Sequence, residues 1–433
     1  MPRTIIVGAG IAGLQLGALL AAEGREVLIL EKLSRVGGRA FLWEKDGFTV
    51  DYGIHLVRFG PKSATAAVMR RLGHELEFVD LGKSRVAFPD GSVADFPTSP
   101  IGFLTTKLMT PMERLRALGL ILKMKGMNPA DLYETSVADW MDSLGVSGGL
   151  RAYLSLVSGS MQVCPFLDRS SAGEMIENMV TVLKRGKSVM YPRRGWKEIY
   201  QVLTAAVSKN GSIRTGAAVA RVVIDNGAAT GVELEGGERI AADEVVVSLP
   251  VQKMFEVLDP GLFPEDYVQL CRNLRPTAGI VLDYGLKRRI SDDSGLWYLT
   301  HPMGFGVFTS NLCPEQAPAG KQLFTWFQPA NLEDMEDEPR AAVMEKELER
   351  ALFRQWPGLE PAIEWRRSAR LKMVDGVEVN IRQHRGKRPG CRPPGVKGLF
   401  LVGDSLAAPG AGGDVGHESA LACYKEMTGK DLD

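Results

Sequence analysis

The chain has 433 residues, and its 52 Lys and Arg residues are balanced by 52 Asp and Glu residues. This balance favours neither nucleic acid nor an anionic surface as a partner, and the length indicates two domains. The five cysteines and five histidines are scattered without the spacing of metal ligands, so no metal site is predicted. No apolar run approaches about 18 residues and no secretory signal is evident, which favours a cytoplasmic protein.

The first 31 residues predict a dinucleotide-binding βαβ unit. A buried strand over 5–7, a helix over 14–24 and a strand over 26–30 surround a G-x-G-x-x-G turn. The candidate cofactor-binding residues of this turn are Gly8, Gly10, Ile11, Ala12 and Gly13. Gly10 would let the backbone approach a pyrophosphate, whose charge the N-terminus of the helix would bind. Glu31 would accept hydrogen bonds from ribose hydroxyls.

The segment from residue 37 to residue 185 changes from glycine-rich loops to helices. Gly37-Gly38-Arg39, a hairpin and the stretch 51–55 come first, and helices are predicted over 104–124, 137–144 and 172–183. The helix at 104 is amphipathic, which is typical of a core-facing helix, with docking on a membrane surface as the alternative. Nine of the 17 methionines lie between Met109 and Met190. They could line a tunnel for a hydrophobic substrate or form an ordinary helical core.

Strands dominate from residue 190 onward. A loop over 191–196 and a helix over 198–208 precede strands predicted over 216–224, 229–234 and 244–249. A second sheet is predicted from strands over 276–284, 304–310 and 322–328, followed by an amphipathic helix over 340–356.

The C-terminal segment predicts a second half of the cofactor site. A strand over 398–402 ends in Gly403-Asp404, and a glycine-rich loop leads into a helix over 414–427. One dinucleotide needs only one phosphate-binding turn. A second acid and a second helix start therefore indicate a longer ligand with another electron-rich end, and FAD fits. Backbone N–H groups near Gly413, Asp414 and Val415 would face the flavin, whose reduced form is negative; a helix dipole stabilises such charge by roughly 0.3–1 kcal/mol.

The cofactor motifs carry a family resemblance. The GAGIAG turn with Glu31, Gly37-Gly38-Arg39, Asp51-x-Gly53-x-His55 and the closing GLFLVGD…GAGGDVGHESAL resemble the flavoprotein superfamily of phytoene desaturases, amine oxidases and protoporphyrinogen oxidases. The motifs are most similar to those of the phytoene-desaturase-related branch. The Tyr-Pro-x-Gly-Gly loop of that branch is similar to YPRRGW here, where Arg194 replaces the first glycine of the pair.

The resemblance implies an α/β (α+β) fold: a glutathione-reductase-like Rossmann FAD domain with an inserted substrate domain of mixed sheet and helices. The FAD domain would comprise residues 1–75, 190–270 and 390–433, and the substrate domain residues 76–189 and 271–389. Aromatic residues of the second sheet, which faces the flavin in this superfamily, could form an apolar wall or pack in a core. They are Trp297, Tyr298, Phe305, Phe308, Trp326 and Phe327.

The resemblance also assigns roles to individual residues. Glu31 would contact the adenosine ribose, Arg39 the pyrophosphate region and Asp404 the ribityl side, while Val219 would offer backbone hydrogen bonds to adenine. The remaining cofactor-binding candidates are Lys32, Gly37, Gly38, Gly53, Ile54, His55 and Gly403.

No nucleophile–base pair stands out in the sequence. Hydride transfer does not need one, because the flavin carries the redox chemistry. His55 and Arg58 are the candidate catalytic residues, beside the expected isoalloxazine position. His417 and the pair Arg193 and Arg194 are more typical of structural roles. The expected partners are a small hydrophobic substrate and a separate electron acceptor such as oxygen or a quinone. The protein is expected to be a monomer or a homodimer, with peripheral membrane contact as an option.

The leading hypothesis is an FAD-dependent enzyme that desaturates, saturates or isomerises an apolar, isoprenoid-like substrate. A flavin amine oxidase is the first alternative, although the loop 406–416 lacks the Tyr or Trp, and the strand 276–284 the Lys, usual in that branch. A redox-neutral flavin mutase and a non-enzymatic flavoprotein scaffold are the others. A second G-x-G-x-x-G is not evident, so NAD(P)H is not expected as the direct reductant.

Overall fold

The computed structural model describes residues 2–186 and 189–432; residues 1, 187, 188 and 433, which fall within the predicted domain segments, lie outside the described residues. A five-stranded parallel sheet has the order β10-β2-β1-β14-β20. Its strands are β1 (Arg3–Val7), β2 (Glu26–Glu31), β10 (Gly211–Thr215), β14 (Glu244–Val247) and β20 (Leu399–Leu401). Ile5, Ile6 and Val246 have no exposed surface, because both faces of the sheet are covered.

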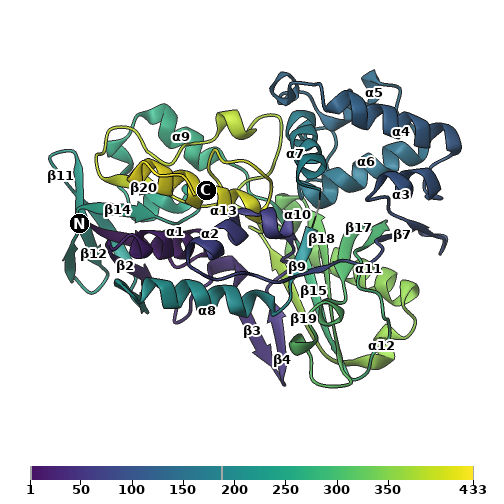
Figure 1. Ribbon diagram of the computed structural model, residues 1–433, viewed down its shortest axis with the longest axis horizontal. Coiled ribbons are helices and arrows are strands. Elements are labelled where there is room, and N and C mark those ends of the chain that lie inside the picture. The colour runs from purple at the N-terminus through teal and green to yellow at the C-terminus, as the bar shows by residue number, and fades with distance from the viewer. Residues whose placement is uncertain (1, 187–188, 433) are drawn as a thin grey trace.

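Helices cover one face of this sheet and a small antiparallel sheet covers the other (Figure 1). On the helical side, α1 (Ile11–Ala22) contacts both α8 (Gly195–Val207) and α13 (Gly413–Thr428). On the other side lie β11 (Val219–Asp225), β12 (Ala228–Leu234) and β13 (Arg239–Ala241), whose Val222 and Val232 share an apolar cluster with Ile5. The predicted βαβ unit is therefore present, with α1 starting at Ile11 rather than Leu14.

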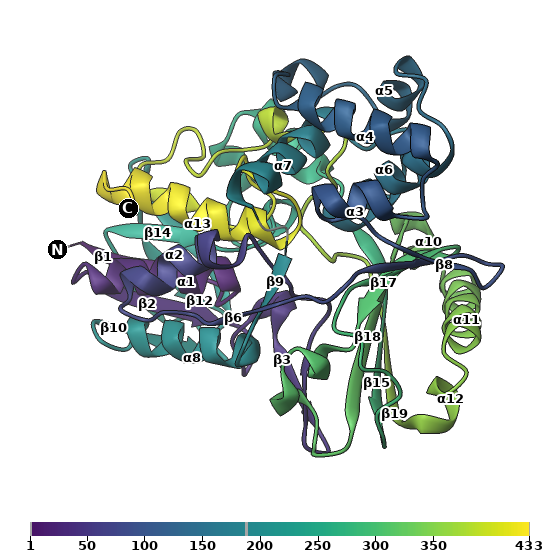
Figure 2. The ribbon, with the colours of Figure 1, turned by 45° about the vertical axis from the view of Figure 1, so that its right-hand side comes forward.

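A seven-stranded mixed sheet in the order β19-β15-β18-β17-β16-β7-β8 forms the other half of the molecule (Figure 2). Its strands are β7 (Arg85–Ala87), β8 (Val93–Asp95), β15 (Ala278–Leu286), β16 (Trp297–Thr300), β17 (Met303–Val307), β18 (Gln322–Ala330) and β19 (Ile363–Leu371). The helices α10 (Leu332–Glu336), α11 (Glu338–Gln355) and α12 (Leu359–Ala362) follow β18, and α11 and α12 pack on one face of the sheet.

The aromatic residues of this sheet do not form a single wall. Trp297, Phe308 and Trp326 join the core beneath α11 and α12, with Leu348 and Leu352. Tyr298, Phe305 and Phe327 lie on the opposite face, in the cluster that contains Tyr153. Of the two alternatives, the structure favours core packing: the six side chains divide between two core clusters, because successive side chains of a strand point to opposite faces.

Residues 100–185 are helical, as predicted, but the helix expected over 104–124 is two helices. The helices are α3 (Pro100–Thr105), α4 (Pro111–Met124), α5 (Val137–Ser143), α6 (Gly148–Met161) and α7 (Ala172–Arg185). Thr110 begins α4 with a reciprocal capping box to Glu113, and Pro111 occupies the first turn, so the chain breaks there. Met109, Met124, Met141 and Met175 are buried in the core, so these four fill the helical interior.

The segments between the two large sheets form short strands and helices. The hairpin of β3 (Leu42–Lys45) and β4 (Phe48–Asp51) leads to β5 (Val57–Arg58), which pairs with β9 (Val189–Pro192); β6 (Phe78–Asp80) pairs with the other edge of β9. The loop predicted over 191–196 therefore starts inside a strand. The helices α2 (Ala64–Arg71) and α9 (Glu265–Asn273) complete the fold.

Sequence patterning missed several strands, among them β10, β16 and β19. The strands β10 and β19 carry several exposed or half-exposed polar residues, which hide their alternation, and β16 is only four residues long. Within the described residues, no helix is both long enough and apolar enough to cross a membrane.

Candidate cofactor and active site

The G-x-G-x-x-G turn has the backbone geometry that its glycines predict. Gly8 has φ +103°, and a Cβ there would lie 2.8 Å from the carbonyl oxygen of Ser248. A Cβ on Gly13 would lie 2.5 Å from the carbonyl oxygen of Gly8. A larger residue at Gly8 would collide with the chain just after β14, and one at Gly13 would force α1 away from the end of β1.

Gly10 differs from its two neighbours, because a Cβ built on it meets no atom within 4 Å. It is the N-cap residue of α1, and no side chain caps that helix. The N-terminus of α13 is similar: Gly412 is an N-cap without a side-chain hydrogen bond, and a Cβ on Gly413 also meets nothing. In contrast, Ser63 and Ser171 cap α2 and α7 with their hydroxyls.

The helices α1 and α13 begin side by side. A Cβ on Gly416 in the first turn of α13 would lie 3.9 Å from Cβ of Ala12 in α1 and 3.7 Å from Cβ of Asp404. Unpaired N–H groups and the positive ends of two helix dipoles therefore meet next to a carboxylate. These features fit FAD, which needs one N-terminus for its pyrophosphate and another for its electron-rich flavin edge.

Glu31 ends β2 with its carboxylate fixed by the backbone. Oε2 accepts a hydrogen bond of 2.8 Å from the N–H of Ala9, and Oε1 accepts one of 2.9 Å from Leu33. The N–H of Ala217 donates to the carbonyl oxygen of Glu31 at 2.9 Å, which brings the start of β11 at Val219 to the same end of the sheet. Lys32 beside it is exposed. These residues thus gather where a ribose and an adenine are predicted.

The Gly37-Gly38-Arg39 segment crosses the glycine turn. The N–H of Gly37 donates to the carbonyl oxygen of Ala9 at 2.9 Å, and a Cβ on Gly38 would lie 3.2 Å from Cα of Gly10. Arg39 donates to Oδ1 of Asp404 at 2.6 Å, which joins the N-terminal and C-terminal cofactor motifs directly. Gly403, with φ +151°, places Asp404 at the end of β20.

Asp375 is a member of this site that sequence reasoning missed. It comes from the segment predicted for the substrate domain, yet its carboxylate would lie 3.5 Å from a Cβ on Gly412 and accepts a hydrogen bond from Thr277 at 3.0 Å. Burial raises its pKa to about 6, and the charge of Asp404 adds to the effect. The neighbouring Gly376 donates its N–H to Asp404 at 2.8 Å. No motif around Asp375 marks it in the sequence.

Arg58 forms an ion pair at 2.9 Å with Asp414, the first acidic residue of α13, and donates to Asn178 at 3.0 Å. Its side chain is only 10% exposed. The two predicted site residues Arg58 and Asp414 are thus in contact, and the guanidinium clamps α13 to α7. Any catalytic role of Arg58 must therefore be compatible with its ion pair to Asp414.

His55 lies in the loop after β4, together with Gly53 and Ile54. Its Nε2 is 3.1 Å from the carbonyl oxygen of Tyr52, and its own carbonyl oxygen accepts from Nε1 of Trp196 at 2.7 Å. Burial lowers the pKa of His55 to about 4, and the positive charge of Arg367 acts in the same direction. The imidazole is therefore neutral near pH 7, with one nitrogen able to donate and the other to accept.

His417 has the structural surroundings expected for it. Its Nδ1 lies 3.0 Å from Oε1 of Gln15 and 3.1 Å from Oγ1 of Thr65, so it joins α13 to α1 and α2. Burial lowers its pKa to about 4. Arg193 and Arg194 likewise form ion pairs on the surface, with Glu77 and Glu198.

Two buried polar groups lie behind the Tyr52–His55 loop. Tyr191 donates its hydroxyl to Asp51, and Gln316 donates to that hydroxyl at 2.7 Å. Burial raises the pKa of Asp51 to about 7. On the seven-stranded sheet, Arg367 pairs with the fully buried Asp283, and its guanidinium lies 4.1 Å from the centre of the Tyr52 ring.

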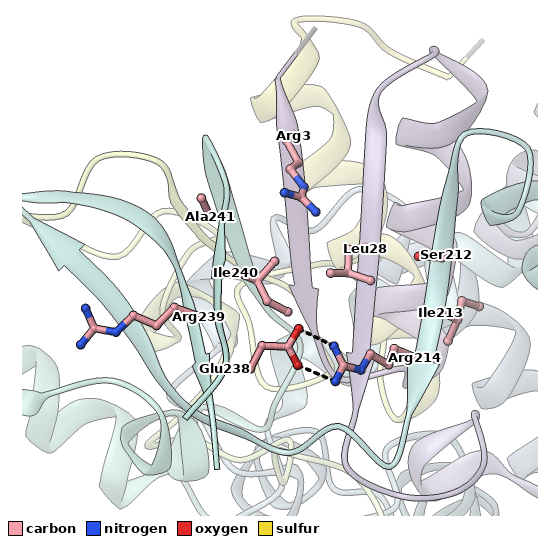
Figure 3. A pocket seen from close by; sticks show the side chains of 9 residues that line it. All are labelled: Arg3, Leu28, Ser212, Ile213, Arg214, Glu238, Arg239, Ile240 and Ala241. Atoms are coloured by element: carbon pink, nitrogen blue, oxygen red, sulfur yellow. Dashed lines mark hydrogen bonds and ion pairs between the residues drawn. The ribbon is translucent and has the colours of Figure 1, made fainter. Parts of the chain in front are cut away.

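A separate hollow of about 510 Å³ lies between the β10 edge of the five-stranded sheet and the small antiparallel sheet. Figure 3 shows Arg214 and Glu238 facing one another across it, joined by two hydrogen bonds of 2.8 and 2.6 Å. It holds none of the glycine motifs, so it is not the cofactor site.

Comparisons with known proteins agree with this geometry. The family model described as flavin containing amine oxidoreductase matches residues 11–420. A zeta-carotene-forming phytoene desaturase from Myxococcus xanthus is 27% identical over 340 residues, 70% of this chain and 63% of that protein. An all-trans-retinol 13,14-reductase from Macaca fascicularis is 25% identical over 66% of this chain and 51% of its own length. The chain therefore spans between half and two thirds of these two relatives.

A crystal structure of an oxidoreductase from Methanosarcina mazei has the same fold, with a TM-score of 0.83 at 22% identity over 98% of this chain and 99% of that one. The predicted superfamily, fold class and FAD cofactor are confirmed. Since the family match extends over almost the whole chain, the protein belongs to the family of flavin-containing amine oxidoreductases, with FAD as the cofactor that both ends of the sequence predict.

Proposed function

We propose that this protein transfers a hydride between FAD and an apolar, isoprenoid or polyene substrate. Bound FAD supplies the two-electron redox chemistry at N5. The observation that carries the substrate class is the cluster of Tyr298, Phe305 and Phe327 on the sheet face that carries Arg367. These rings suit an apolar chain, because a polar substrate group would lose its water there without gaining a partner. The names of both relatives support this class, since carotene and retinol are isoprenoids.

We propose that the glycine turn, Glu31 and the start of β11 bind the adenosine half of FAD. Arg39 and Asp404 would hold the pyrophosphate and ribityl region, and the Gly413–Val415 turn would face the flavin. Gly53, Ile54 and His55 would border the flavin on the substrate side. The neutral His55 can hold a proton at one ring nitrogen and orient a polar atom with it, without placing a fixed positive charge beside an apolar substrate.

Amine oxidation is the competing activity, and Arg367 opposes it. A guanidinium 4.1 Å from the Tyr52 ring centre, whose charge already lowers the pKa of His55, would repel a protonated amine in the same space. The carboxylate nearest to it, Asp283, is already paired with this arginine. The site thus offers no free anion for an ammonium group among these residues.

Anaerobic mixing of the purified holoprotein with polyenes tests the proposal. We expect a saturated or partly saturated isoprenoid to bleach the flavin absorbance band, or a polyene to restore it after chemical reduction. Indifference to every apolar compound, together with hydrogen peroxide release from an amine panel, would overturn it. Turnover of a UDP-sugar only after flavin reduction would instead favour the mutase alternative. The acceptor, the oligomeric state and a cytoplasmic location stay predictions.

A further inference from the structure

The outer surface of α3 and α4 exposes large apolar side chains to an extent not found elsewhere in the described part of the chain. Five of its residues are more than half exposed: Ile101 (73%), Leu104 (51%), Met112 (64%), Leu115 (61%) and Leu122 (68%). Among the large apolar residues described elsewhere, only Val343, at 55%, reaches this level. We call these five residues the α3–α4 surface.

The exposed residues of α4 form a stripe rather than a scatter. With 3.6 residues per turn, Met112, Leu115 and Leu122 lie on one side of the helix, while Ala117 and Met124 face the core on the other. Arg116 and Lys123 lie along the edge of the stripe and are exposed. The helix therefore has two apolar faces, and only one of them is covered by the protein.

The charge around this stripe is one-sided, although the whole chain is neutral. From residue 100 to residue 126 the only acid is Glu113, whose carboxylate accepts hydrogen bonds from the N–H and hydroxyl of Thr110. The basic residues there are Lys107, Arg114, Arg116, Lys123 and Lys125. Among the described ion pairs none involves these five, and Arg114 instead donates to the carbonyl oxygens of Met109 and Leu104.

We propose that the α3–α4 surface docks on an anionic lipid bilayer and receives the apolar substrate from it. An exposed apolar stripe edged by unpaired cations matches a bilayer surface, where acyl chains lie beneath negative headgroups. A second protein copy would bring Arg116 and Lys123 of both copies together at a shared contact, and this repulsion disfavours dimerisation through this face.

The substrate half of the proposal rests on the proposed function and on a continuous row of rings. Phe103 of α3 is buried beneath the α3–α4 surface and lies 5.2 Å from Tyr153 of α6, centre to centre. Tyr153 lies 5.0 Å from Phe96, and Phe96 lies 4.6 Å from Tyr298 on the seven-stranded sheet. The four rings thus form one continuous aromatic row from α3 to the seven-stranded sheet, along which an apolar molecule from the bilayer would pass.

Vesicle sedimentation of the holoprotein tests docking independently of any activity. We expect binding to phosphatidylglycerol-containing vesicles, weakened by salt, and little binding to pure phosphatidylcholine. The double variant Leu115→Ser/Leu122→Ser should bind at least about tenfold more weakly. Arg116→Glu/Lys123→Glu should also lose binding, whereas the matched control Val343→Ser on α11 should not. Unchanged vesicle binding by both double variants would overturn the proposal. It would also be overturned if the unmodified protein bound no vesicles and light scattering showed a dimer that these variants dissociate.

Turnover then separates delivery from chemistry. With a polyene embedded in anionic vesicles, the Leu115→Ser/Leu122→Ser variant should turn over more slowly than the unmodified protein, and the two should be equal on the same polyene in detergent micelles. Equal rates in vesicles would overturn delivery through this surface. Absence of turnover in both media, with vesicle binding intact, would contradict the proposed substrate class and leave the docking result standing.

Discussion

The helices at the cofactor site and those of the segment 100–185 begin in different ways. The helices α1 and α13 start from glycine N-caps and carry no side-chain cap, so their first N–H groups remain free for a ligand. The helices α4, α5 and α7 start from Thr110, Ser136 and Ser171, whose hydroxyls accept from the backbone, and α6 is the exception in that segment because its N-cap forms no side-chain hydrogen bond. One region keeps its backbone donors for a cofactor, and the other uses them for its own stability.

The largest effect is expected in the segment held by side chains. Arg388 and Glu174 are buried, and Arg388 donates to both carboxylate oxygens of Glu174, at 2.9 and 3.1 Å. Arg388→Met leaves the buried carboxylate without its ion-pair partner and with only the backbone N–H of Arg385 as a donor, and should cost about 3–5 kcal/mol of unfolding free energy, measured by urea denaturation. Arg388→Met/Glu174→Gln should regain part of that loss; a double variant as unstable as the single one would contradict the reasoning.

The next effect belongs to the backbone-built region. A Cβ added at Gly10 meets no atom within 4 Å, so the fold of Gly10→Val should persist while flavin binding weakens by about 1–3 kcal/mol, roughly 5- to 150-fold. The flavin-to-protein absorbance ratio and a flavin titration measure this. Gly119→Val on α4 is the matched control, because a Cβ there also meets nothing within 4 Å. Full flavin content in the Gly10 variant would remove Gly10 from the site.

A third effect depends on pH and lies where α13 meets α1. The pKa of His417 is lowered by burial to about 4, below its ordinary value of 6.5, so the native state favours the neutral ring. Its contribution is present above pH 6.5 and is lost as the pH falls toward 4. At pH 5 the loss of unfolding free energy from this group is about 2 kcal/mol. His417→Gln should flatten the loss of stability between pH 7.5 and 5; identical slopes in urea unfolding would show that His417 is not responsible.

The smallest effect tests the capped helices. Thr110→Ala removes the hydroxyl half of the capping box of α4 and should cost about 1 kcal/mol, seen as a lower urea midpoint. Flavin content should stay unchanged, the reverse of the Gly10→Val result. A variant that loses flavin would show that the two regions are more tightly coupled than their separate elements indicate.

Sequence reasoning found the cofactor region because its requirements are local. Gly8 needs φ +103° and Gly13 must sit against the preceding strand, and few residues other than glycine satisfy either condition. The same holds for the Gly412-Gly413 start of α13. Glu31 and Asp404 could be placed because each lies at or just beyond the end of a buried strand, and parallel strands end at one edge of the sheet.

The other half of the site could not be read in this way. Asp375 joins Asp404 and Gly412 from a distant segment, and Tyr191 reaches Asp51 across 140 positions of sequence. Nothing near these residues in the chain differs from an ordinary loop or strand. The aromatic residues of β16–β18 were recognised, but their division between two faces depends on strand register, which the tertiary pairing sets.

The sequence by itself determined that this chain binds a flavin dinucleotide, because backbone conformations reserved for glycine leave a local and specific trace. It also indicated an amphipathic helix at 104–124 without showing which side is covered. Only the tertiary structure decided that α4 keeps an apolar stripe outside, that Arg58 is clamped by Asp414, and that Tyr298, Phe305 and Phe327 share a face. These arrangements depend on contacts between segments that are distant in the sequence. The sequence could not reveal them, because the same side chains would pack equally well in an ordinary core.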